Sequence, residues 1–272
     1  MSDNLQLKDN MSSEENAENK APESDILGRK IFFLYPTPSI INQLVQDLAQ
    51  QEYEVYVARD KQRLARALKK YTNSVVYANL DDGMSEAEWD RWISGILTII
   101  PTLNIGCFTT NNDEEIRSKY INKIKITCGY LPLKVDMSGT SEIIINILEK
   151  LNSKGRRKYL RAAVENEKNT TMNIPHNDGY IKSTIKDISV VGLSCVFDAD
   201  PDLKKNTLIK AIQIKLQSIL INIDGIVFGS REEEGQKIYV ILFMQKTSPE
   251  TRAKIRKYIQ QNLQSKIDSE IN

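Results

Sequence analysis

The hydrophobic pattern of this chain changes at Asn152-Ser-Lys-Gly155, and that change constrains the fold more than any other feature. Before it, compact apolar runs alternate with amphipathic stretches at helical spacing. After it, short apolar runs recur between turn signals. A chain of 272 residues is long enough for two domains of ordinary size. We therefore predict a polar tail at residues 1–25, one domain at 26–152 and a second at 153–272.

The first domain is predicted to be α/β, with a parallel sheet covered by helices on both faces. Five strand-like runs each precede a helical stretch, and this alternation favours such a sheet. The first helix carries Ile41, Leu44, Val45 and Leu48 on one stripe. The predicted strands are 30–35, 54–57, 74–78, 103–108 and 125–128, and the predicted helices are 40–51, 61–71, 85–99, 113–121 and 141–151.

The second domain is predicted to be an antiparallel β-barrel followed by a C-terminal helix. Several short strands at regular spacing favour a barrel. Ser248-Pro249 is a good helix start, because proline fits the first helical position. That helix would turn Ile255, Ile259 and Leu263 inward. The predicted strands are 162–166, 179–188, 192–197, 207–216, 218–223, 225–229 and 237–243, and the predicted helix is 248–266.

Two short motifs at the start of the second domain indicate an anionic guanine nucleotide. They hold three arginines, an aspartate, a serine and a glycine: Arg156, Arg157, Arg161, Asp187, Ser189 and Gly192. A guanidinium can donate two parallel hydrogen bonds to O6 and N7 of guanine, pair with phosphate, or stack on the purine. A carboxylate only accepts, so it suits the guanine edge that carries N–H donors. The serine can bond phosphate or backbone, and the glycine lets the main chain approach a ligand.

RxxxR (Arg157 to Arg161) followed by DxSxxG (Asp187 to Gly192), with β-strands around them, resembles the PilZ domain family. The resemblance covers residues 153–272, and Val191 departs from it where many members have a second glycine. It implies a small β-barrel that binds the bacterial second messenger cyclic di-GMP. It also implies that the arginine segment folds over a ligand lying on the DxSxxG edge. Arg156, just before RxxxR, implies two stacked ligand molecules per site.

The resemblance implies an effector that acts by binding and is not an enzyme. Ligand would pin the arginine segment, reorient the two domains and so signal to a downstream protein partner in motility or surface behaviour. The alternative is a ligand-independent adaptor that works through protein contacts. The sequence shows no acidic metal cluster and no nucleophile–base pair, so it does not favour nucleotide hydrolysis.

The order of elements in the first domain resembles a response-regulator receiver of flavodoxin-like fold. Where such receivers carry an acidic pair for Mg²⁺, this chain has Tyr35-Pro36, and where they carry the phospho-acceptor aspartate it has Asn79. Mg²⁺ would lack its hard oxygen ligands, and an amide accepts no phosphoryl group. We therefore predict a pseudo-receiver that is not phosphorylated and serves as scaffold or interaction module. Phosphorylation on Asp81 is the alternative. Candidate matches to the family's switch threonine and lysine are Thr109 or Thr110 and Lys134.

Composition narrows the remaining possibilities. A net charge of +1 implies no general polyanion-binding surface, so DNA binding is not expected. Cys107, Cys128 and Cys195 are widely spaced in apolar contexts, which indicates reduced core thiols in a cytoplasmic protein. With a single histidine, no metal site is expected. Apolar runs fall far short of the roughly 20 residues that span a bilayer. Residues 1–25 are expected to be disordered, since they bury too little apolar surface to offset ordering entropy.

Overall fold

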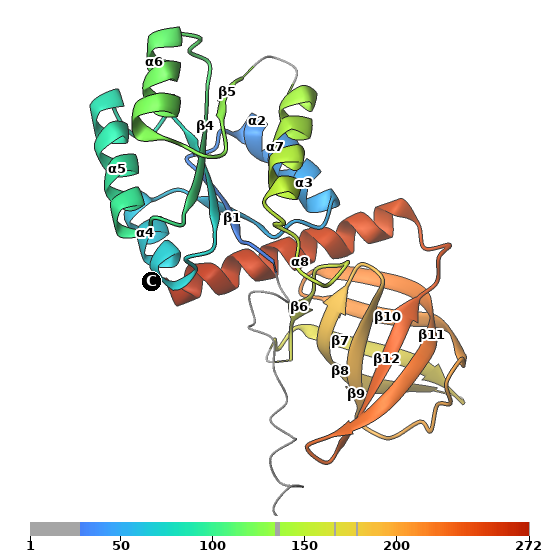
Figure 1. Ribbon diagram of the computed structural model, residues 1–272. Helices are drawn as coiled ribbons and strands as arrows, with labels where there is room; N and C mark the ends of the chain where they lie inside the picture. The colour runs from blue at the N-terminus through green and yellow to red at the C-terminus, as the bar shows by residue number, and fades with distance from the viewer. Residues whose placement is uncertain (1–27, 134–136, 166, 178, 272) are drawn as a thin grey trace, which may run out of the picture.

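The structure is a computed structural model that describes residues 28–133, 137–165, 167–177 and 179–271. An α/β half and a β-barrel half lie side by side (Figure 1). The expectation of a disordered tail at residues 1–25 and the switch-lysine candidate Lys134 fall outside the described residues. None of the helices in the described part of the chain combines the length and apolarity needed to cross a membrane.

The α/β half contains a parallel sheet of five strands in the order β2-β1-β3-β4-β5. This is the order of flavodoxin-like folds, which confirms the predicted receiver-like architecture. The strands are β1 (Ile31–Leu34), β2 (Val55–Ala58), β3 (Val75–Asn79), β4 (Asn104–Thr109) and β5 (Tyr130–Pro132).

Helices cover both faces of this sheet, as Figure 1 shows. One face packs against Ile40 and Leu44 of the first helix and Ile144 of the last; the other packs against Leu64 and Trp89. The helical segments are α2 (Pro38–Ile40), η1 (Ile41–Val45), α3 (Gln46–Gln50), α4 (Lys61–Lys70), α5 (Glu86–Ile99), α6 (Glu114–Ser118), η2 (Lys119–Ile124) and α7 (Ser138–Lys150). The first three form one continuous helix whose middle is π-helical.

The last strand of the sheet lies later in the sequence than predicted. Residues 125–128 were predicted as a strand, but Lys125 has a left-handed backbone (φ 64°) that ends η2. Gly129 also has positive φ (86°), so the chain bends twice before it aligns with its neighbour. Ladder pairing with β4 therefore begins only at Tyr130, opposite Cys107.

The C-terminal half is a closed antiparallel barrel of six strands, which confirms the predicted barrel. The strand order is β8-β7-β10-β11-β12-β9, and pairing of β8 with β9 closes the ring. A short strand, β6 (Ala162–Ala163), adds to the outer side of β8. The barrel strands are β7 (Thr170–His176), β8 (Gly179–Ser189), β9 (Gly192–Phe197), β10 (Leu208–Leu216), β11 (Ile219–Glu233) and β12 (Gln236–Phe243).

The strands predicted for the barrel differ from the observed ones in two places. Strand β7 was not predicted, because Asn173 and Pro175 lower its strand propensity; Pro175 is tolerated near the hairpin end, opposite Tyr180. The separate strands predicted at 218–223 and 225–229 are one strand, β11. Its glycines mark a bulge and a close approach rather than strand ends.

A single helix, α8 (Pro249–Glu270), packs into the cores of both halves. Its first part buries Ile255, Tyr258 and Ile259 against the barrel. Its last part buries Ile267 with the residues of the parallel sheet and α4. Figure 1 shows α8 running under the α/β half and along the barrel. The helix therefore fixes how the two halves sit against each other.

We predict that Ile267→Ala lowers the free energy of unfolding by about 2–5 kcal/mol, because it removes a side chain only 3% exposed from the shared interface. The measurement is urea unfolding followed by circular dichroism. Leu220→Ala is the matched control, since Leu220 is 75% exposed, and it should cost less than about 0.5 kcal/mol. Equal effects of the two substitutions would contradict the role assigned to α8.

Candidate functional site

The aspartate, serine and glycine of the second motif lie on the hairpin that joins β8 to β9. Ser189 pairs with Gly192 across a two-residue turn. The Ser189 hydroxyl donates to the Gly192 carbonyl oxygen (3.0 Å) and accepts from the Val191 amide (3.4 Å). Because Ser189 is buried, its hydroxyl stabilises the turn. The accessible surface at this position is formed by the backbone and not by the serine side chain.

Gly192 is required by the neighbouring strand. A Cβ there would lie 2.5 Å from the Ile241 carbonyl oxygen and 3.1 Å from Leu242 Cα. Any side chain at this position would therefore push β9 away from β12 and distort the hairpin edge. The sequence predicted that this glycine permits a close approach; the approach that the structure shows is between two strands.

Asp187 and Arg161 lie 26 residues apart in the sequence and meet in space. Arg161 Nη1 is 3.3 Å from Asp187 Oδ1. The contact follows from β6, which places Ala163 opposite Asp187 immediately after the arginine. The other carboxylate oxygen accepts from the Ser194 hydroxyl across the β8–β9 ladder. The ion pair is partly open to water, with side-chain exposures of 48% for Arg161 and 27% for Asp187.

Arg156 and Arg157 lie in the exposed linker just before this pair. Neither has a hydrogen bond or ion pair with any residue that the structure describes. The linker backbone is nevertheless held at both ends: the Ser153 carbonyl accepts from the Arg29 amide (2.9 Å), and the Leu160 amide donates to Glu52 Oε2 (3.0 Å). The linker thus carries two exposed guanidiniums without a partner among the described residues, a few positions before the arginine that contacts Asp187.

In the α/β half, the residues at the positions of a receiver's phosphorylation site are bonded to and packed against one another. Asn79 is buried at the end of β3, and its Nδ2 donates to the Tyr35 carbonyl oxygen (2.9 Å). Tyr35 has a left-handed backbone (φ 53°), and its ring occupies the space beside Gly83, where a Cβ would lie 2.4 Å from it. At the position where an acidic pair was sought in the sequence, the chain therefore has an aromatic side chain packed against Gly83.

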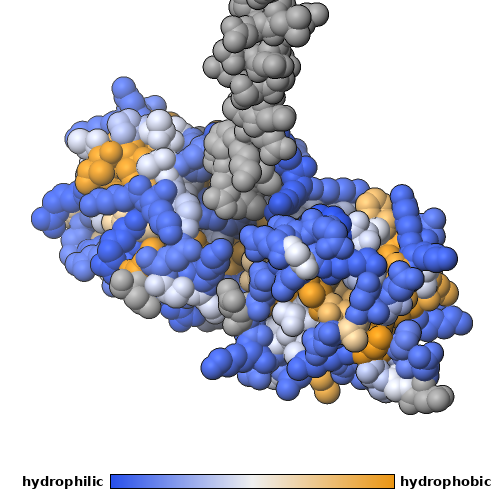
Figure 2. Space-filling view, turned by 90° about the horizontal axis from the view of Figure 1, so that it is seen from below, coloured by the Kyte–Doolittle hydropathy of each residue, from blue (hydrophilic) through white to orange (hydrophobic). Residues whose placement is uncertain are grey.

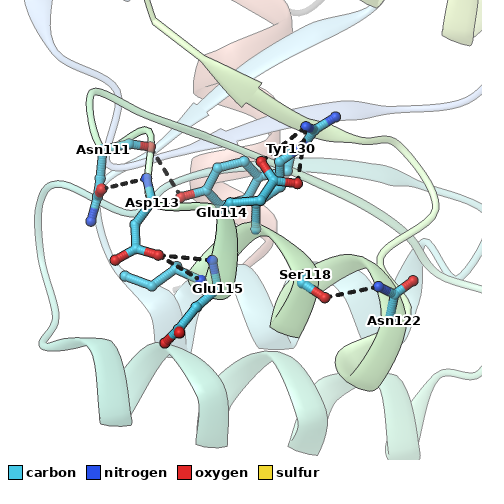
Figure 3. A network of polar contacts seen from close by, with 9 residues as sticks. Asn111, Asp113, Glu114, Glu115, Ser118, Asn122 and Tyr130 are labelled. Atoms are coloured by element: carbon cyan, nitrogen blue, oxygen red, sulfur yellow. Dashed lines mark hydrogen bonds and ion pairs between the residues drawn. The ribbon is translucent and has the colours of Figure 1, made fainter.

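Asp81 is tied into the loop that follows β4. One carboxylate oxygen accepts from the Thr109 hydroxyl and the other from the Thr110 amide (2.7 Å). The same loop is held further along, where the Tyr130 hydroxyl donates to the Asn111 carbonyl oxygen (3.2 Å), as Figure 3 shows. Within the described ranges no group of three or more His, Cys, Asp or Glu side chains could hold a metal ion.

A family model described as PilZ domain matches residues 155–261. This segment is a PilZ domain. The match begins at the arginine linker and ends inside α8, so it includes all six motif residues. The expected resemblance to the PilZ family is confirmed for this segment. No curated protein matches the chain.

Solved structures of low identity resemble each half. The PilZ half is similar to the PilZ domain with c-di-GMP of YcgR from Escherichia coli, at 14% identity and a TM-score of 0.34, covering 42% of this chain and 93% of that one. It is also similar to the MrkH–c-di-GMP complex of K. pneumonia, at 21% identity and a TM-score of 0.37, covering 43% and 57%. The chain spans about half of the longer YcgR structure, 51%.

The α/β half is similar to the signal receiver domain of an HD domain-containing protein from Pseudomonas fluorescens Pf-5. The identity is 20% and the TM-score 0.39, with 47% of this chain and 99% of that one covered.

Three residues around the PilZ site were missed in the sequence. Arg252 of α8 donates from Nη1 to the Val190 carbonyl oxygen (3.2 Å) at the motif hairpin and reaches Met244 and Gln245 from Nη2. Ser194 orients Asp187, and Glu52 binds the linker. Arg252 and Glu52 act across more than 60 residues and Ser194 acts across the β8–β9 ladder, so no local motif marks any of the three.

Acetyl phosphate should not label the full-length protein. The Asp81 carboxylate is held by Thr109 and Thr110, and Asn79, which cannot accept a phosphoryl group, is hydrogen-bonded to the Tyr35 carbonyl oxygen. Phosphate-affinity electrophoresis would test this, with an active receiver domain as positive control. Robust labelling that disappears in Asp81→Asn would show that the α/β half is a working receiver.

Proposed function

We propose that the PilZ domain of this protein binds cyclic di-GMP between the arginine linker and the β8–β9 edge. The observation that carries the proposal is the contact of Arg161 with Asp187, at the end of a linker whose Arg156 and Arg157 are exposed and have no partner among the described residues. Free guanidiniums suit phosphates and the O6/N7 edge of guanine. The carboxylate of Asp187 suits the guanine N–H donors.

Ligand entry requires little energy under this proposal. An exposed ion pair contributes about 0–1 kcal/mol, so the half-exposed contact between Arg161 and Asp187 is readily exchanged for contacts with the ligand. Ser189 and Gly192 support binding by holding the hairpin in shape. Arg156 adds a third cation at the linker, and we propose that it allows two stacked ligand molecules per site. The role is binding and not catalysis.

Under this proposal, Glu52 couples ligand binding at the linker to the α/β half. Its Oε2 accepts from the Leu160 amide, between two linker arginines, and its Oε1 lies 3.1 Å from Arg256 Nη2 of α8. The Glu52 side chain is only 12% exposed, so solvent weakens these contacts less than surface ones. When ligand draws the linker onto the barrel, Leu160 leaves Glu52 and the two halves reorient. Order–disorder changes of this kind are an established mode of switching.

We infer that the protein acts in the bacterial cytoplasm on a downstream protein partner, in motility or surface behaviour. Its three cysteines are free and buried, and burial raises the pKa of the Cys195 thiol to about 12 and that of Cys128 to about 11. At neutral pH such thiols stay protonated and unreactive, in keeping with a reducing compartment.

A ligand-independent adaptor is the second candidate, favoured by apolar side chains exposed on the barrel. Figure 2 shows hydrophobic surface among the hydrophilic surface of the barrel half. The large apolar residues exposed there include Tyr180, Leu208, Leu220 and Phe228. Such residues are compatible with protein contacts in the ligand-binding effector as well as in the adaptor. The partnerless guanidiniums favour the ligand-binding one.

Replacing Arg157 and Arg161 together by alanine should weaken cyclic di-GMP binding at least about 100-fold, because two charge-assisted hydrogen bonds contribute roughly 1.5 kcal/mol or more each. Titration calorimetry on the full chain would measure affinity and stoichiometry, with two ligand molecules expected. Arg59→Ala with Arg63→Ala is the control with the same loss of charge, and it should bind as wild type. Similar weak binding by wild type and the Arg157/Arg161 variant would favour the adaptor, while a stoichiometry of one would refute only the two-molecule site.

Glu52→Ala should uncouple ligand binding from domain movement. Since it removes the contacts to Leu160 and Arg256, we expect cyclic di-GMP to bind about threefold tighter, as the loss of one competing hydrogen bond implies. The ligand-induced change in small-angle scattering should shrink. Replacing the exposed Glu142 of α7 by alanine is the control. A full scattering response in Glu52→Ala would exclude this residue as the coupling contact.

A further inference from the structure

The outer face of the barrel carries a row of partly exposed apolar side chains. Leu208, Ile226 and Leu242 are direct cross-strand neighbours on β10, β11 and β12, so their side chains lie on the same face. Leu208 is 48% exposed and Leu242 39%, with the half-buried Ile226 between them. Successive side chains of a strand point to opposite faces, and the adjacent residues on these strands are buried in the barrel core: Ile209, Val227 and Ile241. The row therefore faces outward.

Phe228 extends this row at a bulge in β11. Val227 and Gly229 pair with consecutive residues of β12, so Phe228 is the extra residue, and it is 57% exposed. Lys205 Nζ lies 5.6 Å from the centre of its ring. Residues 228–233 of β11 pair with β12 alone, so no described strand flanks them on the β10 side. Exposed apolar side chains that lie together in this way mark a contact surface.

The end of this surface nearer the β10–β11 hairpin is basic. Lys246 Nζ lies 3.2 Å from Asp224 Oδ2, and the lysine side chain remains 71% exposed. Lys210 lies beside the same carboxylate, because the amide of the following residue, Ala211, donates to Asp224 Oδ1 (3.0 Å). Lys210 is exposed and has no ion pair with any described residue. Two lysines around one aspartate leave a net charge of +1, four residues before Phe228 (228 − 224).

The other end of the surface is the acidic hairpin that joins β11 to β12. Figure 1 shows this hairpin extending past β9, whose pairing with β12 reaches only to Ile238. It contains Arg231-Glu-Glu-Glu234, three glutamates and one arginine, with a net charge of −2. Gln236 lies on the same face of β12 as Leu242, since six residues separate them (242 − 236), and Gln236 is paired with Glu233. The surface is therefore apolar in the middle and oppositely charged at its two ends.

We propose that a second copy of this chain docks on this surface, across a two-fold axis that crosses β11 near Phe228. In such a contact both copies present the same patch, so the patch has to be complementary to itself. A rise of about 3.3 Å per residue places Asp224 and Glu233 roughly 13–16 Å on either side of Phe228. The two-fold rotation therefore lays the Glu233 end of each copy over the Lys210 end of the other, and the apolar row of each copy against that of its partner.

The charge pattern favours a second copy over a different protein. A partner segment of uniform charge would match one end of the surface and be repelled by the other, whereas a rotated copy matches both. The contact goes beyond the proposed function and needs no nucleotide, since neither the linker arginines nor Asp187 takes part. Its test is therefore separate from that of cyclic di-GMP binding.

Sedimentation velocity of the full chain without nucleotide measures the contact. Wild type should pass from monomer to dimer in the range of about 1–100 µM, typical of a small contact. Phe228→Ser should weaken dimerisation at least about 100-fold, a factor of about ten for the anchor lost from each copy. Leu220→Ser is the matched control, since Leu220 is 75% exposed on the same strand but eight residues away (228 − 220), and it should dimerise as wild type does.

A wild type that stays monomeric throughout that range, or a dimer that Phe228→Ser leaves unchanged, would overturn the proposal. An equal loss in Leu220→Ser would do the same, because the effect would then not depend on the surface around Phe228. Circular dichroism melts check that each variant is folded.

Charge reversal tests the two-fold arrangement itself. One variant carries Glu233→Lys with Glu234→Lys, and a second carries Lys210→Glu with Lys246→Glu. Each alone brings like charges together at both ends of the contact and should dimerise at least about tenfold more weakly than wild type. An equimolar mixture of the two pairs lysine with glutamate at both ends and should recover a mixed dimer within about threefold of wild-type affinity at low salt. A mixture that sediments as two monomers would exclude this contact.

Discussion

The contact between Arg161 and Asp187 is the interaction on which the PilZ site depends. It is weak, because both groups are partly exposed and such pairs contribute about 0–1 kcal/mol. Its importance is positional: β6 beside β8 brings the end of the linker to the motif carboxylate, and the Ser194 hydroxyl donates a hydrogen bond to that carboxylate. A strong buried pair here would block the site. A half-exposed one assembles the site and leaves its charges available for exchange with an anion.

Helix α8 connects this site to the rest of the molecule through three polar contacts on one rigid element. Arg252 holds the motif hairpin at Val190, and Arg256, one helical turn later, holds Glu52. Gln264, two turns further on, exchanges hydrogen bonds with both backbone groups of Val57 on the edge strand β2. The helix also buries side chains in both cores. A displacement of the hairpin or linker therefore acts on the α/β half through packed, hydrogen-bonded groups rather than through a loose tether.

Local patterns predicted the fold well and the site only in part. The spacing of apolar residues predicted the right architecture for both halves. Strands and helices each bury one or both faces, and each kind of element therefore has its own period of apolar residues along the sequence. The strand predictions failed where a single residue overrides the hydrophobic pattern. The left-handed backbone of Lys125 moves the start of β5 to a later residue, and Pro175 lowers the strand propensity of β7, which was therefore not predicted. The motif residues were found because they lie close in sequence. Arg252 and Glu52 were not, since contacts across more than 60 residues leave no local signature.

The two halves differ in which polar groups remain available to a ligand. Under the proposed function, this difference favours one direction for the signal. In the α/β half, the Tyr35 ring packs against Gly83, and both oxygens of Asp81 are already bonded within the protein. What this half offers instead is the edge of β2, to which Gln264 of α8 is hydrogen-bonded. In the PilZ half, Arg156 and Arg157 remain without partners among the described residues. Under the function proposed above, input at the linker arginines and output through the α/β half is the order that fits both, since a half whose polar groups are already satisfied has little differential affinity to give a ligand.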